Sequence, residues 1–413
     1  MLKTLARPAK VSWSPSSNQS SLLATGTIEG TVNEFFETTS TLEIFDTSLG
    51  NGTPDMTSKG QVSVNESFTS LAWGTKGIND RRFPSGIVAG GMADGAVHFW
   101  DANAIMQNSS SSLIARSNNG HRGSVLGLDF HPKEPNVLAS CGGDGQVLVW
   151  DLKDPSKPTF PPSLEKRLDS PMTCLQWNQS VHYILASGNN SGDTAIYDLR
   201  NKRTIINLHN STRQRLKTNA ISWNPTQGFS LAVTYSGSSL VEIWDLRKTL
   251  QPKLRMDAQS NLMSMSWNRH DPRIILTSGE DGNLALWNSE TGDRLRDYPQ
   301  QANTCFDCVW NPHTPSVVVT ASLEGNVSVQ SLHHGGSIVP SWYQKPAGVS
   351  FGFGGKLVHF SNENNQSPTK GVVNVKQVST DETLLKLSAD FQQVHTFFFV
   401  TFCLILSLLL III

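Results

Sequence analysis

Two cysteines three residues apart, Cys305 and Cys308, are the residues of this chain whose types and spacing best suit chemistry. A C-x-x-C pair supplies half of a tetrahedral zinc site, but no second pair or nearby histidine completes one. The pair lies in an apolar stretch that we expect to form a strand, where a period of two places the thiols on opposite faces. We therefore predict two buried structural cysteines and no metal site.

No other pattern in the chain predicts catalysis. Two glycine-rich pieces, "GGMADG" at 90–95 and "GFGGKL" at 352–357, fall at expected hairpin turns and are not followed by helical patterns, unlike phosphate-binding loops. Paired carboxylates, a nucleophile elbow and a metal-ligand cluster are not found either. We expect no catalytic residues and no cofactor, so the chain is predicted not to be an enzyme.

Composition narrows the class of protein further. The 413 residues carry 33 Lys and Arg against 34 Asp and Glu, so no basic excess favours nucleic acid as a partner. Five cysteines, an odd number, argue against a disulfide framework, and the N-terminus has no apolar signal segment. We expect a reduced, cytoplasmic protein built from short strands and turns.

The chain repeats one pattern seven times: a strand ending in an aromatic residue, an apolar strand, a Gly/Asp turn, and a strand ending in aromatic-Asp or a relative of it. The repeats end at residues 46, 101, 151, 198, 245, 288 and 331, the last with a degenerate Gln330-Ser331. Ten of the 11 tryptophans fall at the aromatic positions, and Trp342 is the exception. A period of roughly 40–45 residues with a Trp-Asp end predicts WD-repeat blades, so we expect an all-β, seven-bladed propeller over 1–335.

Two further features of this propeller are expected. In the third repeat, four residues could form a buried hydrogen-bonded network with a structural role: His121, Ser140, Asp144 and Trp150. The segment "LKTLAR", residues 2–7, precedes the first repeat and can supply the outer strand of the last blade.

Past the seventh repeat, residues 336–379 form a linker and a second group of strands. "VSFGF", "GKLVHF" and "GVVNVKQV" are strand-like, and such a small strand group is marginal alone in water. It either packs on its own propeller or inserts into another protein by strand addition. "TDETLLKL" then predicts a helix start with Thr380 or Asp381 as the cap, within a truncated helical region over 380–393.

Several segments give a specific resemblance: "LATGT", "LAWG", "CFDCVWNP" and above all "GVSFGFGGKLV". With them the chain resembles the larger WD-repeat subunit of the COPII outer cage, of the protein transport protein Sec family, over about residues 1–393. That family has a seven-bladed propeller, a β-blade donated to a partner, an α-solenoid and a proline-rich tail. The solenoid and the proline-rich tail are absent here, which puts cage-edge dimerisation and contact with the inner coat in doubt.

The resemblance implies a structural component of the COPII outer cage that promotes formation of transport vesicles from the endoplasmic reticulum. Its partners would be the smaller six-bladed WD-repeat subunit, completed by the donated blade, and neighbouring propellers at cage vertices. The expected location is the cytoplasm, the cytoplasmic face of the endoplasmic reticulum membrane and COPII-coated vesicles. Carried onto this sequence, the partner-binding residues of the donated blade are Phe351, Phe353, Leu357, Val358, Phe360, Val372, Val373 and Val375.

The last twenty residues, 394–413, are almost entirely apolar. They are either a short tail anchor that adds to a peripheral membrane association through the coat, or translated intron, which we favour. Two other functions compete with the cage subunit. A WD-repeat adaptor of another complex, such as a ubiquitin-ligase receptor, would need no donated blade. A propeller hydrolase would bring titratable residues to the central channel.

Overall fold

The computed structural model describes residues 2–28, 31–32, 38–48, 54–78, 82–117, 120–158, 170–211, 215–299, 304–332, 348–352, 354–361, 372–378 and 381–391. These residues fall into two compact units, Met1–His334 and Gly335–Ile413, and each is described by itself.

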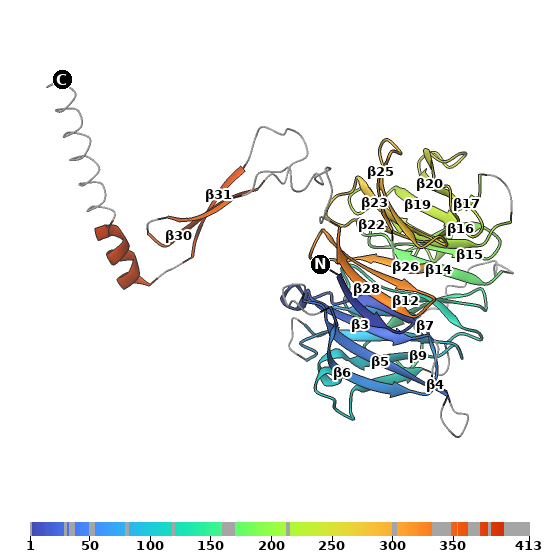
Figure 1. Ribbon diagram of the computed structural model, residues 1–413, viewed down its shortest axis with the longest axis horizontal. Coiled ribbons are helices and arrows are strands. Elements are labelled where there is room, and N and C mark those ends of the chain that lie inside the picture. Colours follow the sequence, from blue (N-terminus) through green and yellow to red (C-terminus); the bar gives the residue numbers. More distant parts are fainter. Residues whose placement is uncertain are drawn as a thin grey trace. The chain divides into compact units, whose positions relative to one another are not determined.

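The described strands of the first unit form seven antiparallel sheets, which are the predicted seven blades of a WD-repeat propeller (Figure 1). Blade 1 contains β2 (Ala9–Trp13), β3 (Leu22–Thr27), β4 (Thr31–Val32), β5 (Thr38–Asp46) and β6 (Thr57–Val64), with a 3-10 turn η1 (Ser17–Gln19). Blade 2 contains β7 (Phe68–Gly74), β8 (Ile87–Met92), β9 (Val97–Asp101), helix α1 (Ala102–Met106) and β10 (Leu113–Ser117). Blade 3 contains β11 (Val125–Phe130), β12 (Val137–Gly142) and β13 (Val147–Asp151).

The remaining blades each have four strands. Blade 4 contains β14 (Met172–Trp177), β15 (Ile184–Asn189), β16 (Asp193–Asp198) and β17 (Arg203–His209), and blade 5 contains β18 (Thr218–Trp223), β19 (Ser230–Tyr235), β20 (Leu240–Asp245) and β21 (Leu254–Asp257). Blade 6 contains β22 (Leu262–Trp267), β23 (Ile274–Gly279), β24 (Asn283–Asn288) and β25 (Arg294–Pro299). Blade 7 combines β26 (Cys305–Trp310), β27 (Val317–Ser322) and β28 (Asn326–Ser331) with β1 (Leu2–Ala6) from the N-terminus.

The ring closes in blade 7, where the two ends of the propeller meet. Strand β1 pairs antiparallel with β28, from Leu2 opposite Gln330 to Ala6 opposite Asn326, so the predicted closure by the N-terminal segment is confirmed. Figure 1 shows the blue N-terminal strand beside the orange β28. The innermost strands also contact one another in ring order, including β2 of blade 1 with β26 of blade 7. A closed ring leaves no long unpaired strand edge between first and last blade.

An extra residue interrupts the inner strand of six blades. In β26 the register shifts between Cys305 and Asp307, and the burial pattern along the strand then departs from strict alternation. Both cysteines are buried, as predicted, but the register shift between them means that a strict period of two does not describe their faces. A β-bulge adds one residue to a strand and resets which face follows.

Each blade buries apolar side chains on both faces of its second strand. β8, β15, β19, β23 and β27 are buried at every position. Because a single sheet cannot cover both of its own faces, these strands require a neighbouring blade on each side. The tryptophans found by the repeat analysis lie in the layers between blades, and Trp100, Trp150 and Trp177 are at most 1% exposed.

The aspartate after the closing aromatic residue terminates the third strand of the blade. A carboxylate oxygen accepts a hydrogen bond from the backbone N–H two residues later, at 2.9 Å in Asp198 to Arg200 and 3.0 Å in Asp245 to Arg247. Asp46, Asp101 and Asp151 make the same bond, as does the amide oxygen of Asn288. This turn is the physical reason for the Asp of the repeat.

Indole hydrogen bonds join consecutive inner strands. Trp177 Nε1 in blade 4 donates to the Asp129 carbonyl of blade 3 at 3.1 Å, and Trp223 Nε1 donates to the Gln176 carbonyl at 3.1 Å. Trp310 and Trp13 donate to the preceding blade in the same way, and the Trp13 bond links blade 1 to blade 7. An indole N–H buried in a blade interface is thereby satisfied by a carbonyl of the preceding blade, so each of these bonds depends on correct docking of the two blades.

Asp129 adds a second bond at the junction of blades 3 and 4. Its carboxylate accepts the backbone N–H of Trp177 at 2.8 Å. The side chain is only partly covered, beside the central channel, yet burial raises the pKa of Asp129 to about 7 against the opposing effect of the Trp177 hydrogen bond. A neutral carboxyl group is thus favoured at this junction at mildly acidic pH.

The structure brings the four network residues of blade 3 together. Trp150 Nε1 donates to Ser140 Oγ at 2.9 Å, Ser140 Oγ lies 2.8 Å from His121 Nε2, and His121 Nδ1 lies 2.9 Å from Asp144 Oδ1. Burial would raise the pKa of Asp144, but the hydrogen bond and charge of His121 outweigh burial and lower it. Blade 6 has only the first of these bonds, from Trp287 Nε1 to Thr277 Oγ1 at 2.9 Å.

We predict that Ser140→Ala lowers the free energy of unfolding by about 2–4 kcal/mol, because it leaves Trp150 Nε1 and His121 Nε2 buried without a partner. Thr277→Val is the matched control, since it orphans one indole alone and should cost about 1–2 kcal/mol. Denaturant unfolding followed by tryptophan fluorescence measures both. Equal losses in the two variants would contradict a network role for His121.

The second prediction concerns Asp129. Its pKa is higher in the folded chain than in the unfolded chain, so the folded state binds the proton more tightly and stability falls as pH rises from about 4 through about 7. Asp129→Asn keeps an oxygen for the Trp177 N–H and cannot ionise. The free energy of unfolding of Asp129→Asn, minus that of the unsubstituted protein, should rise by about 1–3 kcal/mol between about pH 4 and about pH 7. Above about pH 7 the difference should stay constant. Thermal unfolding at a series of pH values tests this, and a difference that does not change with pH would refute it.

Candidate partner-binding sheet

The second unit contains a three-stranded antiparallel sheet formed by β29 (Gly348–Gly352), β30 (Lys356–Ser361) and β31 (Val372–Gln377). Gly354 and Gly355, between β29 and β30, have φ of 75° and 66°, a left-handed conformation that favours glycine. Gly355 accepts the Val378 N–H at 2.9 Å, which ties the end of β31 to this turn. The glycines of the distinctive "GFGGKL" segment therefore build the hairpin.

The register gives this sheet apolar residues on both faces. Phe351 lies opposite Leu357, and both belong to one face. Val358, the next residue of β30, lies on the other face opposite Val375, together with Val373. A sheet in contact with one core has one apolar face, whereas a sheet between two neighbours has two. These strands have the pattern of the propeller blades in the first unit.

Unlike the blades, this sheet leaves its apolar side chains uncovered. Phe351 is 79% exposed, Val373 62% and Val375 59%, whereas Val88, Val233 and Val318 of the propeller are fully buried. Leu357 and Val358 are partly buried. Exposed apolar side chains of this size on a small sheet are typical of surfaces that contact other proteins.

The structure describes only some of the eight partner-binding residues that the resemblance implies. It assembles Phe351, Leu357, Val358, Val373 and Val375 into one sheet. The backbone of Phe360 pairs with Val373 and that of Val372 with Ser361, and Phe353 lies outside the described residues. The sequence reasoning missed Val378, which is 57% exposed just after β31 and lies outside the alternation of Val373 and Val375.

A helix over residues 382–391 follows the sheet, and it bears out the predicted helix start. Asp381 is the cap, since its carboxylate accepts the Thr383 N–H at 2.9 Å, and the Thr383 hydroxyl bond lowers the pKa of Asp381. Gly354 N–H donates to Ser388 Oγ at 2.7 Å, which joins the helix to the β29–β30 turn. Leu384, Leu387 and Phe391 are more than half exposed at helical spacing, a stripe that "LLKLSADF" already contained.

The described residues contain no group of three or more His, Cys, Asp or Glu placed to hold a metal ion. Burial raises the pKa of Cys305 to about 11 and that of Cys308 to about 12, which keeps both thiols protonated and poor as nucleophiles. Within the same described part of the chain, no helix has the length and apolar character needed to cross a bilayer. The apolar residues 394–413 lie outside it.

Residues 113–151 match the family model "WD domain, G-beta repeat". Among curated proteins, mouse "Protein transport protein Sec31B" is 31% identical over 387 residues, which are 87% of this chain and 33% of that protein. "Protein transport protein SEC31" of Dictyostelium discoideum is 32% identical over 71% of this chain and 22% of its own length. The chain therefore spans about a third or less of these relatives.

Solved structures show the same similarity. A chain in "COPII on membranes, outer coat vertex" matches with a TM-score of 0.72 and 27% identity, over 91% of this chain and 100% of that one. A chain in "The structure of the COPII coat assembled on membranes" matches equally well over 55% of its length. Across both kinds of comparison, the chain is homologous over most of its length to the Sec31 proteins of the COPII outer coat.

Proposed function

We propose that this protein is a structural component of the COPII outer coat and promotes the formation of transport vesicles from the endoplasmic reticulum. The observation that carries the proposal is the sheet β29–β31, which has exposed apolar residues on both faces and follows a ring that is already closed. Similarity along the whole of a chain from an outer coat vertex supports the same conclusion.

The proposed partner of the sheet is the smaller, six-bladed WD-repeat subunit of the coat. A six-bladed propeller that is open at one position has two blade faces without a neighbour. A sheet with Phe351 and Leu357 on one face and Val358, Val373 and Val375 on the other can cover both. Insertion would also pair a free edge strand with the partner by strand addition.

The proposed role of the propeller is contact with neighbouring coat propellers at vertices, at the cytoplasmic face of the endoplasmic reticulum membrane and on coated vesicles. The protein would reach the membrane through the coat. It would act by assembly alone, without catalysis, because its buried cysteines are held protonated and its hydrogen-bonded His121 serves Ser140 and Trp150.

We predict that the complete chain, kept in mild detergent because residues 397–413 carry no charge, co-purifies with the smaller six-bladed subunit in equal amounts. Phe351→Asp with Val375→Asp places a carboxylate on each face of the sheet and should abolish the complex, because each buried charge costs several kcal/mol. Leu250→Asp is the control, since Leu250 is fully exposed on the propeller.

Retention of the double variant by the smaller subunit would exclude insertion of this sheet. If the unsubstituted chain itself did not bind, an adaptor role in another complex would become the better explanation. Circular dichroism of each variant shows whether the propeller has stayed folded.

A further inference from the structure

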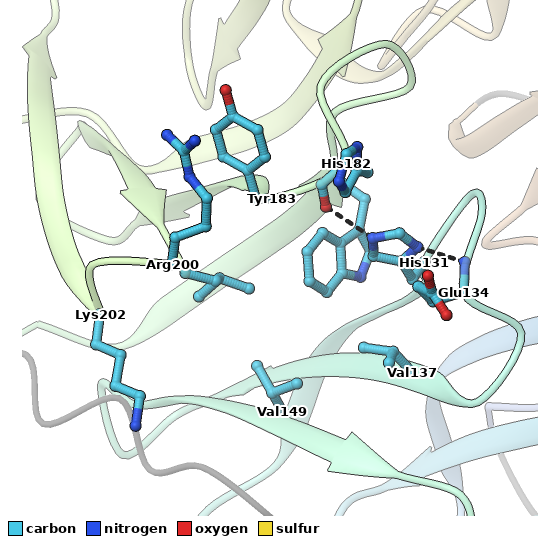
Figure 2. Close-up of a pocket in the computed structure, with 10 residues that line it drawn as sticks. His131, Glu134, Val137, Val149, His182, Tyr183, Arg200 and Lys202 are labelled. Carbon is cyan, nitrogen blue, oxygen red and sulfur yellow. Dashed lines mark hydrogen bonds between the residues drawn. The ribbon is translucent and has the colours of Figure 1, made fainter.

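A cavity of about 290 Å³ lies between blades 3 and 4, on the face of the propeller that carries the loops after each first and third strand. Figure 2 shows its residues: His131 and Glu134 from the loop after β11, His182 and Tyr183 from the loop after β14, and Arg200 from the turn after β16.

The inside of the cavity is apolar. Val137, Val149 and Leu199 contribute aliphatic surface, and the buried indole of Trp177 closes one side. A volume near 290 Å³ is at the lower limit for small-molecule pockets, and no buried polar group is available to orient a cofactor. The space suits one bulky apolar side chain.

The hydrogen bonds of His131 make its ring part of this apolar wall. Nδ1 accepts the Glu134 N–H at 2.7 Å, so the ring hydrogen resides on Nε2, which donates to the His182 carbonyl at 2.7 Å (Figure 2). Burial lowers the pKa of His131 despite the bond to His182, so the ring stays neutral at physiological pH. The ring packs edge-on against Trp177 with 4.7 Å between centroids.

One rim of the cavity is rigid and cationic. The Arg200 guanidinium lies 3.4 Å from the centre of the Tyr183 ring and is held there by two bonds to the Asp198 carboxylate, at 3.0 and 3.2 Å. Lys202 follows in the same turn and Arg203 begins β17, and both are exposed. Asp198 is buried and pairs with Arg200, so the net positive charge of this rim comes from Lys202 and Arg203.

The opposite side of the cavity carries the exposed carboxylate of Glu134. Lys133, also exposed, precedes Glu134 in the same loop, so the two charges of that loop offset each other. The net charge around the opening therefore comes from the cations of blade 4. A peptide with an acidic residue beside its apolar anchor fits this charge.

We propose that this cavity binds a linear segment of a partner protein, in which one bulky apolar side chain fills the space beside Trp177 and an adjacent Asp or Glu faces Arg200 and Lys202. The neutral His131 and the Arg200–Tyr183 stack are already in place, so little conformational freedom is lost at the site on binding.

Blade 5 supplies a matched control. Arg247 pairs with Asp245 and lies 3.8 Å from the centre of the Phe229 ring, the same arrangement as Arg200, and Lys248 is exposed in the same turn. Neither Arg247 nor Lys248 lines the cavity between blades 3 and 4.

The test is a selection of short random peptides displayed on phage against the immobilised complete chain. Enriched sequences should share one bulky apolar residue beside Asp or Glu. A synthetic peptide of that type should bind about tenfold more weakly to Lys202→Glu and within about twofold of normal to Lys248→Glu, because rim charges act over short distances. Val137→Phe, which fills the cavity, should abolish binding. Binding should also weaken as salt is raised.

Three results would overturn the proposal. One is a selection with no enrichment. Another is enrichment without an acidic preference. The last is a selected peptide whose affinity is unchanged by both Lys202→Glu and Val137→Phe, which would place its site elsewhere. Lys202→Glu alters an exposed side chain, so the test holds even if Val137→Phe does not fold.

Discussion

A sheet whose two faces are both apolar has to be covered twice, and this constraint governs both units of the protein. Seven such sheets in the first unit cover one another, and a ring is the arrangement in which each of them has two neighbours. Sheet β29–β31 has the same two-faced pattern, but the described residues of its own unit leave Phe351 on one face and Val375 on the other exposed. The same need to cover both apolar faces that closes the propeller also supports the proposed partner of this sheet.

The repeat pattern predicted the blades because its tryptophans and its aspartates each have a distinct structural role. The aromatic residue fills the layer between sheets, and Asp198 or Asp245 ends the third strand by accepting a backbone N–H. Each role falls at a fixed position within one repeat, so the spacing of these residues in the sequence was enough to predict it. The β-bulge at Cys305–Asp307 was not predictable in the same way, because an inserted residue leaves the strand's apolar character unchanged.

The contacts between neighbouring blades also could not be predicted from the sequence. The indole bond from Trp177 to the Asp129 carbonyl joins residues 48 positions apart, and the cavity beside it combines three separate loops. His131 lies one residue after β11, at the repeat position that Asn178 and Asn268 occupy, and like them it accepts a backbone N–H three residues later and donates to a carbonyl of the next blade. Only the fold shows that its ring is neutral and faces Trp177. For the sheet, alternation located its strands, while the split of its apolar residues over two faces required the register of β30.

The pairing of β1 with β28 has a consequence for the newly made chain. Residues 2–6 leave the ribosome well before their partners at 326–330, which follow about 320 residues later. At typical synthesis rates, the N-terminal strand waits roughly 15–60 s for its place in the sheet. During that time the partly built ring has open edges at both ends, so folding of the early blades must proceed without closure. Closure of the ring by residues 2–6 is therefore possible only after blade 7 has been synthesised.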